Sequence, residues 1–281
     1  MWKLTGFADE IAHDLDEQIG LLTKLGIKHV EFRSAWGTKV LDLTQEQLDK
    51  AKAKLDAAGI TLSSVGSDIG KIQITDPFED HLKRAAHAVE VAKFFGSPYI
   101  RMFSFFIPEG EDPTQYRDEV MDRTRAFVRL AEAGGVTMLH ENEKDIYGDT
   151  PERVVELVTT MDSPNYRAIF DPANYVQCGF KPVDEAYPVV KEYTDYFHIK
   201  DASATEVDAE GLNKVLPAGE GDGQVRELVA ALKRDGYEGF FSIEPHLGQF
   251  DAFGGLAGVE LWTKAYDAFT GIVEEQGIEW E

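Results

Sequence analysis

Cysteine is almost absent from this chain, since Cys178 is the single one among 281 residues. One thiol cannot form a disulfide within the chain, and so rare a cysteine is typical of a protein that folds in a reducing compartment. Long apolar runs are also missing: no stretch approaches the roughly 18 residues of a membrane helix, and Asp9 and Glu10 interrupt the N-terminus before a signal peptide could form. We therefore expect a cytoplasmic protein without a membrane span.

Basic residues are scarce relative to acids. The chain has 28 lysines and arginines against 51 acids, which gives a net charge of −23. A field of this sign repels nucleic-acid phosphates and anionic membranes. The expected partner is therefore a small molecule and neither nucleic acid nor a membrane, and the sequence is compatible with a homo-oligomer.

A regular alternation of helix-like and strand-like segments runs along the chain. Helical segments end at Gly26, Gly59, Gly96 and Gly134, which lie 33, 37 and 38 residues apart, and a short β-rich run follows each. Eight such units of about 35 residues would fill the chain. The eight strands are expected at 3–7, 27–32, 60–62, 99–103, 136–139, 166–171, 195–200 and 239–243.

This alternation predicts the fold. Strands that alternate with helices form a parallel sheet, and eight units predict a closed (β/α)8 TIM barrel with its active site at the C-terminal ends of the strands. No linker or charge block divides the chain, so we expect a single domain over residues 1–281. The alternative is an open doubly wound sheet, but no glycine-rich phosphate loop follows the first strand. Helix starts agree: Thr44–Gln47 form a capping box, and Asp76-Pro77 and Thr150-Pro151 each place a cap before a first-turn proline.

Barrel strands are buried on both faces, so polar residues within them are informative. On strand 195–200, His198 and Lys200 share one face, and both are costly to bury unless they are paired or ligated. Alternation turns further polar side chains inward near the C-terminal ends of the other strands. These are Glu31, Arg33, Arg101, Glu141, Glu143, Asp171, Ser242, Glu244 and His246.

Four of the inward residues suit a divalent cation, one from each of four consecutive strands: Glu141, Asp171, His198 and Glu244. Three carboxylates and one imidazole form a hard, oxygen-rich site, which favours Mn²⁺, with Mg²⁺, Co²⁺ and Zn²⁺ also compatible. The alternative interpretation is a set of ion pairs at the strand ends, with Lys200 and Arg101 as counter-charges.

Five segments carry a recognisable pattern: Val136–Asn142, Ile169–Asn174, His198–Asp201, Ala218–Asp222 and Gly236–Pro245. In these segments the chain resembles the sugar phosphate isomerase/epimerase family of xylose isomerase-like barrels, whose relatives include tagatose epimerase, hydroxypyruvate isomerase, inosose dehydratase and endonuclease IV. The resemblance implies that the four residues above are metal ligands and that Glu141 and Glu244 also act as acid and base. It further implies that Lys200 and Asn174 face the substrate.

Two positions depart from the tagatose epimerase pattern. Asn174 stands where that type has a histidine, and Ala204 stands where it has an arginine, so a ketohexose substrate is not specifically indicated. Arg101 and Lys200 are the inward cations on which a phosphate site could draw. An unphosphorylated or keto-modified sugar is therefore expected at least as much as a sugar phosphate.

The remaining candidates for substrate contact are Glu143, Arg101, His246 and Glu31. Each has a structural alternative: Glu143 could orient a ligand or face solvent, and Glu31 could simply pair with Arg33. His140 lies on the outward register of its strand, where we expect a hydrogen-bonded interior residue and not a ligand.

The expected reaction is metal-dependent epimerisation or isomerisation of a sugar or keto-sugar, by proton abstraction next to a carbonyl through an enediolate. Lewis-acid polarisation and two positioned carboxylates, Glu141 and Glu244, would supply the catalysis. The first alternative is a lyase or dehydratase, because a hydroxyl could leave from the same intermediate. Endonuclease IV-like DNA repair needs further histidines and a basic groove, which disagrees with the charge of −23. A barrel that only binds sugar is the last alternative.

Overall fold

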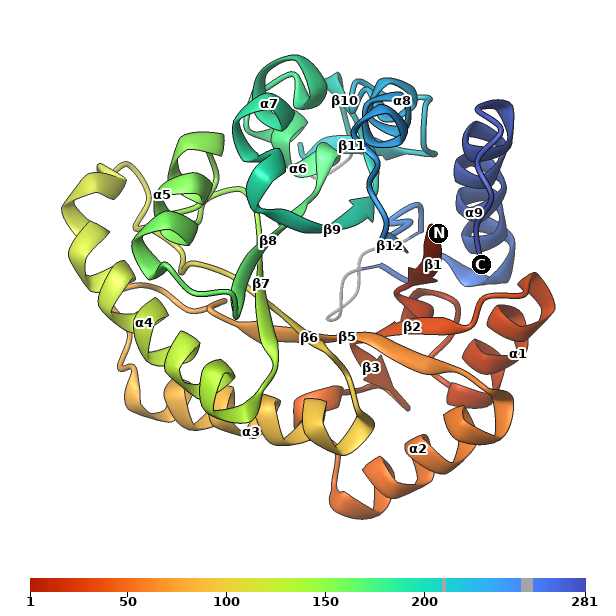
Figure 1. Ribbon diagram of the computed structural model, residues 1–281, viewed down its shortest axis with the longest axis horizontal. Coiled ribbons are helices and arrows are strands. Elements are labelled where there is room, and N and C mark those ends of the chain that lie inside the picture. The colour runs from red at the N-terminus through yellow and green to blue at the C-terminus, as the bar shows by residue number, and fades with distance from the viewer. Residues whose placement is uncertain (209–210, 249–254) are drawn as a thin grey trace.

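The computed structural model describes residues 1–208, 211–248 and 255–281. Eight parallel strands form a barrel with the helices outside it, as Figure 1 shows, and their hydrogen-bonded order is β1-β12-β9-β8-β7-β6-β5-β2. The predicted (β/α)8 TIM barrel is confirmed. The barrel strands are β1 (Lys3–Gly6), β2 (His29–Phe32), β5 (Thr61–Ile69), β6 (Tyr99–Met102), β7 (Thr137–Glu141), β8 (Tyr166–Phe170), β9 (Thr194–Ile199) and β12 (Phe240–Ile243).

Helices follow the strands along the chain and cover the barrel. The α-helices are α1 (Leu15–Leu25), α2 (Gln45–Ala58), α3 (Glu79–Phe95), α4 (Arg117–Gly134), α5 (Pro151–Met161), α6 (Pro172–Gln177), α7 (Tyr187–Val190), α8 (Val225–Asp235) and α9 (Gly258–Glu275). Shorter helical turns are η1 (Ala8–Glu10), η2 (Val40–Asp42), η3 (Pro113–Tyr116), η4 (Pro182–Ala186) and η5 (Lys191–Tyr193). No helix within the described ranges is long and apolar enough to span a bilayer.

The helix ends follow the sequence signals with two differences. Gly26, Gly59 and Gly96 adopt the left-handed conformation just after their helices, whereas the left-handed residue after α4 is Gly135, one residue later than the expected Gly134. The capping box of Thr44 and the cap of Thr150 are both present. Helix α3 begins at Glu79 and not at Asp76-Pro77, because the Asp76 carboxylate accepts a hydrogen bond from Gln73 N.

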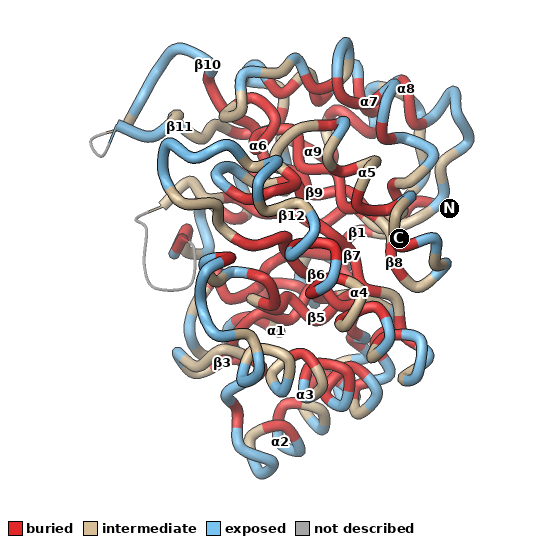
Figure 2. The backbone as a smooth tube through the Cα atoms, turned by 90° about the vertical axis from the view of Figure 1, so that its left-hand side faces the viewer, coloured by how far each residue is buried: buried red, intermediate tan, exposed pale blue. Residues whose placement is uncertain are grey.

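Two antiparallel hairpins were not expected from the sequence. β3 (Ser34–Ala35) pairs with β4 (Thr38–Lys39), and β10 (Asp201–Val207) pairs with β11 (Asn213–Leu216). The second hairpin stands out from the body at the upper left of Figure 2. This hairpin lies in the long connection between β9 and α8. A second long connection, 245–258 between β12 and α9, lies partly outside the described residues.

The barrel interior is layered, and this layering positions the site. Most buried apolar residues belong to one cluster that contains helix residues and the outward register of the strands, whereas Leu139, Ile169 and Tyr196 form a separate small cluster. Each of these three residues lies two positions before Glu141, Asp171 or His198. Because side chains two apart on a strand point to the same face, the three polar residues form the next layer toward the C-terminal end.

Candidate metal centre and substrate cavity

The four predicted metal ligands meet at one place in the barrel. Glu141 ends β7, Asp171 follows β8, His198 lies on β9 and Glu244 follows β12. One ligand atom from each lies within 4.8 Å of the other three, and all four residues are buried. This is the arrangement of a candidate site for one cation.

The cluster is arranged around Nδ1 of His198. This nitrogen lies 3.1 Å from Glu141 Oε1, 3.5 Å from Glu244 Oε2 and 3.9 Å from Asp171 Oδ2. The ammonium of Lys200 lies beside the same carboxylates, 2.9 Å from Asp171 Oδ2 and 3.0 Å from Glu244 Oε2. One imidazole nitrogen and three carboxylates therefore face one another, with Lys200 as a neighbouring counter-charge.

The fixed cations do not balance this acidic centre. Within the part of the chain that the structure describes, ion pairs or hydrogen bonds connect six buried carboxylates, three of them in the cluster itself, with only three buried lysine or arginine side chains beside the histidines. The carboxylates are Asp9, Glu10, Glu31, Glu141, Asp171 and Glu244, and the bases are Arg33, Arg101 and Lys200. Burying unpaired charge is expensive, so a divalent cation fits this donor set and would remove most of the imbalance.

The sequence Asp171-Pro-Ala-Asn174 explains how one ligand is placed. Asp171 is the N-cap of α6 with proline at the next position, and its Oδ1 accepts a hydrogen bond from Asn174 N at 2.9 Å. This leaves Oδ2 for the cluster. The side chain of Asn174 also donates to Glu141 Oε1 at 3.2 Å, so the predicted substrate contact holds two candidate ligands in place.

The surroundings of the three carboxylates shift their pKa values in different directions. Burial raises the pKa of Asp171 to about 6, although Lys200 opposes the shift. Burial acts in the same direction on Glu141, but the charges of His198 and Arg101 outweigh it and lower its pKa to about 2. The pKa of Glu244 also falls well below its usual range, because Lys200 and His246 outweigh burial. Glu141 and Glu244 are therefore ionised at neutral pH.

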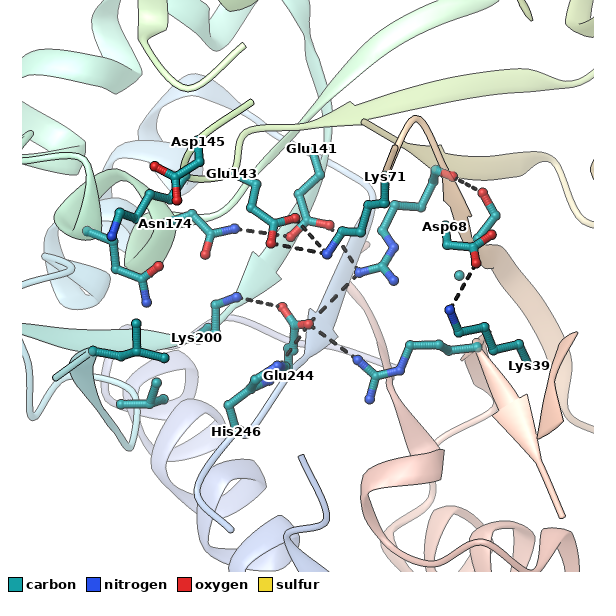
Figure 3. Close-up of a pocket in the computed structure, with 18 of the residues that line it drawn as sticks. Lys39, Asp68, Lys71, Glu141, Glu143, Asp145, Asn174, Lys200, Glu244 and His246 are labelled. Carbon is teal, nitrogen blue, oxygen red and sulfur yellow. Dashed lines mark hydrogen bonds and ion pairs between the residues drawn. The ribbon is translucent and has the colours of Figure 1, made fainter. Parts of the chain in front are cut away.

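A cavity of about 1070 Å³ opens above the cluster at the C-terminal end of the barrel. Figure 3 shows Glu141, Lys200 and Glu244 pointing into it from different strands. It is also lined by Arg33, Arg101, Glu143 and His246, which the sequence placed inward, and by Asn174, which the family resemblance placed next to the substrate. Glu31 is the exception among the predicted substrate contacts, because it is fully buried beneath His198 and does not line the cavity.

The cavity contains more basic side chains than the sequence indicated. Lys39, Lys71, Arg84, Lys144 and Lys214 line it in addition to the inward arginines and Lys200. Most have an acidic partner: Lys39 and Arg84 both contact Asp68, and Lys71 lies 2.8 Å from Glu143 Oε2. Glu143 therefore pairs with Lys71 at the cavity wall, where Figure 3 shows the two side by side.

The sequence analysis missed the acids that follow the first strand. Asp9 and Glu10 are buried in η1, where Arg33 Nε lies 2.8 Å from Asp9 Oδ2 and Arg33 Nη2 lies 3.2 Å from Glu10 Oε1. Glu10 Oε1 also lies 3.0 Å from Nδ1 of His246. Two consecutive acids shortly after the first strand were the signal that could have revealed them.

The contacts of Glu31 and His140 differ from each other. Arg33 and Glu31 do not form the pair that the sequence allowed, since Arg33 contacts Asp9 and Glu10 whereas Glu31 contacts His198 and Tyr196. His140 is buried away from the cluster, and its Nε2 lies 2.9 Å from Ser104 Oγ, as expected for an interior residue.

Asn142 is a further residue that the sequence analysis did not single out. Its side chain brackets the backbone of Asp171, donating to the carbonyl at 3.0 Å and accepting from the amide at 2.9 Å. This contact ties the end of β7 to the end of β8, so it helps to hold two candidate ligands at the same height.

The chain belongs to the xylose isomerase-like TIM barrel family, whose model matches residues 19–267. Among curated proteins it is 22% identical over 173 residues to a 3-dehydroshikimate dehydratase of Bacillus anthracis, covering 61% of each chain. It is 28% identical over 190 residues to a 2-epi-5-epi-valiolone 7-phosphate 2-epimerase of Actinoplanes sp., covering 65% of this chain and 63% of that protein. The match thus spans less than two thirds of either relative. Among solved structures, the IolI protein with a bound zinc atom superposes with a TM-score of 0.76 at 16% identity, over 97% of this chain and 98% of that one.

Proposed function

We propose that this protein is a divalent-metal-dependent epimerase or isomerase of a sugar or keto-sugar. The observation that carries the proposal is the convergence of Glu141, Asp171, His198 and Glu244 beneath a cavity large enough for a small polyhydroxylated molecule. Mn²⁺ is the preferred ion for this oxygen-rich set, and Mg²⁺, Co²⁺ and Zn²⁺ are compatible with it. When bound, the ion would polarise a substrate carbonyl and so acidify the neighbouring C–H bond.

The protein's own side chains would handle the proton. Glu141 and Glu244 are ionised at neutral pH, since the pKa of each is lowered, so either can accept a proton. They come from β7 and β12, with β8 and β9 between them in the sheet, and so approach the cavity floor from different sides. One carboxylate would remove the proton next to the carbonyl, and the other would return it on the opposite face of the enediolate. Return to the neighbouring carbon would give isomerisation instead.

Lys200 and Arg101 would hold the substrate oxygens. Both are buried cations that line the cavity, and each contacts a proposed acid–base residue: Lys200 contacts Glu244, and Arg101 Nη1 lies 3.1 Å from Glu141 Oε2. A positive charge at this depth would stabilise negative charge that develops on a substrate oxygen. Asn174, Glu143 and His246 would complete the contacts from the cavity wall.

A lyase or dehydratase is the second candidate. One of the two curated relatives is named a dehydratase and the other an epimerase. In the site proposed here, either class of reaction would begin with removal of a proton next to a carbonyl. In the dehydration, a β-hydroxyl would leave from the carbanion that proton removal forms. Lys200, which lines the cavity, would stabilise the departing oxygen.

Reaction in D₂O distinguishes the two candidates. The protein is incubated with Mn²⁺ and a panel of keto-sugars, and the products are followed by NMR and mass spectrometry. An epimerase or isomerase incorporates deuterium at the carbon next to the carbonyl without loss of water, whereas a dehydratase releases water and forms an unsaturated or aromatic product.

Glu244→Gln tests the assigned residues. It removes one acid–base group and one charged ligand at nearly constant volume, so we expect at least a 10²-fold loss of kcat. Glu238→Gln is the matched control, because this exposed residue pairs with the N-terminus away from the cavity and should leave the rate unchanged. A Glu244→Gln enzyme as fast as wild type, or a wild type inert on every keto-sugar, would reject the proposal.

A further inference from the structure

A buried carboxylate lies directly beneath the candidate metal centre. Glu31 is fully buried on β2, and its Oε2 lies 3.2 Å from Nε2 of His198, the ring nitrogen that points away from the cluster. Its other oxygen, Oε1, has no hydrogen-bond partner among the residues that the structure describes. A carboxylate at this position carries a desolvation cost that an apolar residue would avoid, so packing does not explain it.

A chain of three hydroxyl groups leads to the same carboxylate oxygen. Tyr196 donates its hydroxyl proton to Glu31 Oε2 at 3.0 Å. Because that proton is used, Ser63 must donate to Tyr196 across their 2.9 Å contact, and Thr5 must donate to Ser63 across 2.7 Å. The four residues come from four strands, β1, β2, β5 and β9, and all are fully buried. The three hydroxyl groups therefore all donate in the same direction, and Glu31 is the final acceptor of this row of hydrogen bonds.

The two nitrogens of His198 therefore face different environments. Nδ1 faces Glu141, Asp171 and Glu244, whereas Nε2 faces Glu31. A cation held by the cluster would need the lone pair of Nδ1, so a neutral imidazole would keep its one proton on Nε2, where Glu31 accepts it. The lone pair of Nδ1 is then directed at the cluster.

We infer that Glu31 is a positioning residue that holds the His198 imidazole with its proton on Nε2 and its Nδ1 directed at a cation. This inference rests on the metal site of the proposed function but not on the reaction. It also replaces the expectation that Glu31 contacts substrate. Carboxylates that accept from a ligating histidine set the ring orientation and tautomer, and their loss weakens metal binding.

Metal affinity tests the role of Glu31. The full chain is stripped with a chelator and titrated with Mn²⁺ by calorimetry, and circular dichroism confirms that each variant is folded. Glu31→Leu removes the acceptor and is expected to lower the affinity by about 10- to 100-fold. Glu31→Gln keeps an acceptor oxygen and is expected to recover most of that loss.

Tyr196→Phe is the matched control. It deletes the neighbouring hydroxyl while Glu31 continues to accept from His198, so its affinity should stay closer to wild type than that of Glu31→Leu. If Tyr196→Phe loses as much affinity as Glu31→Leu, the effect belongs to barrel packing and the inference is wrong. Unchanged Mn²⁺ affinity in Glu31→Leu would also overturn it.

The tautomer can be observed directly, and this measurement does not need Glu31→Leu to fold. Long-range ¹⁵N–¹H spectra of the Zn²⁺-loaded wild type should show the His198 proton on Nε2, and a proton on Nδ1 would contradict the inference. A wild type that binds neither ion would reject the metal site itself. If the wild type binds the ion and the Glu31 variants bind it with the same affinity, only the role of Glu31 is rejected.

Discussion

Single side chains in this site serve two purposes at once. Asp171 caps α6 through Oδ1 and faces the cluster through Oδ2, and Asn174 both donates to that cap and contacts Glu141. The sequence predicted the four-residue cluster because alternation along a strand determines which side chains share a face. It could not predict these double roles, because they depend on contacts between strands far apart in the chain.

The sequence also could not predict how deep in the barrel each inward side chain lies. Glu31 and Arg33 have the same inward register, yet Arg33 lines the cavity whereas Glu31 lies beneath His198. Alternation gives the face of a strand but not the level that a residue occupies when strands are tilted and staggered around a barrel. This is why Glu31 was assigned to the substrate.

His140 should make the protein sensitive to mild acid. Burial lowers its pKa to about 4, and its Nδ1 has no hydrogen-bond partner in the described part of the chain, so a proton added there would be an unsatisfied buried donor. Its ordinary pKa of 6.5 applies in the unfolded chain, so the unfolded state binds more protons and stability falls as pH drops from about 6.5 to 4. The expected loss is about 3 kcal/mol.

Urea unfolding at pH 7 and pH 4.5 with a chelator measures most of this loss, because pH 4.5 lies just above the lowered pKa. His140→Gln keeps a polar group near Ser104 but cannot be protonated, so its stability should change less between the two pH values than that of wild type. Equal pH dependence in the two proteins would contradict the assignment to His140.

At the scale of elements, the glycine-rich turn after β11 is built around one carboxylate. Asp201, at the start of β10, accepts hydrogen bonds from the backbone amides of Ala202, Gly219, Gly221 and Gly223, at 2.7 to 3.0 Å. A Cβ at Gly221 would lie 2.4 Å from Asp201 Oδ1, so the turn can wrap the carboxylate only with glycine there. The turn fixes the residue that follows Lys200, and through it the edge of the cavity.

Asp201→Asn should therefore destabilise the fold. The amide NH₂ would face two backbone N–H groups and leave both unsatisfied, which costs about 2–4 kcal/mol in the free energy of unfolding. Gly221→Ala should destabilise through the clash with Asp201. The matched control is Gly20→Ala in α1, where an added Cβ meets nothing within 4 Å and helix propensity predicts a gain of about 0.5–1 kcal/mol. Denaturant unfolding compares the three, and a neutral Asp201→Asn would refute the interpretation.

The elements themselves were largely predictable, and the misses have local causes. The eight strands and the glycine ends of the helices follow from short-range patterns that the structure retains. The β10–β11 hairpin was missed because the chain reverses there without a two-residue turn signal between clear apolar runs. Helix α3 began late because Asp76 caps the preceding turn instead.

At the scale of the whole molecule, the acidic centre should link metal binding to stability. Among the described residues joined to the cluster, buried carboxylates outnumber buried lysines and arginines by three, and this excess favours any state in which a cation is present. A ligand that binds only the folded state at 100 times its Kd adds about 2.7 kcal/mol. For a chain of this size that corresponds to a rise in Tm of roughly 5 °C.

Calorimetry of the metal-free protein with and without Mn²⁺, Mg²⁺, Co²⁺ or Zn²⁺ measures this rise. Glu244→Gln should show a reduced shift, because it removes one charged donor from the cluster. If no ion raises the Tm of wild type, the four residues form a structural ion-pair network, which was the second interpretation of the sequence.

The order of the strands leaves one seam in the barrel. β1 and β2 are the two ends of the hydrogen-bonded sheet, and no ladder joins them among the described residues. Side chains bridge that gap: Arg33 and Ser34, just after β2, contact the carboxylate of Asp9, just after β1. Between β1 and β2, where no backbone hydrogen bonds close the sheet, these side-chain contacts hold the edge of the cavity together. The width of the cavity entrance at this point therefore depends on the ion pair between Arg33 and Asp9.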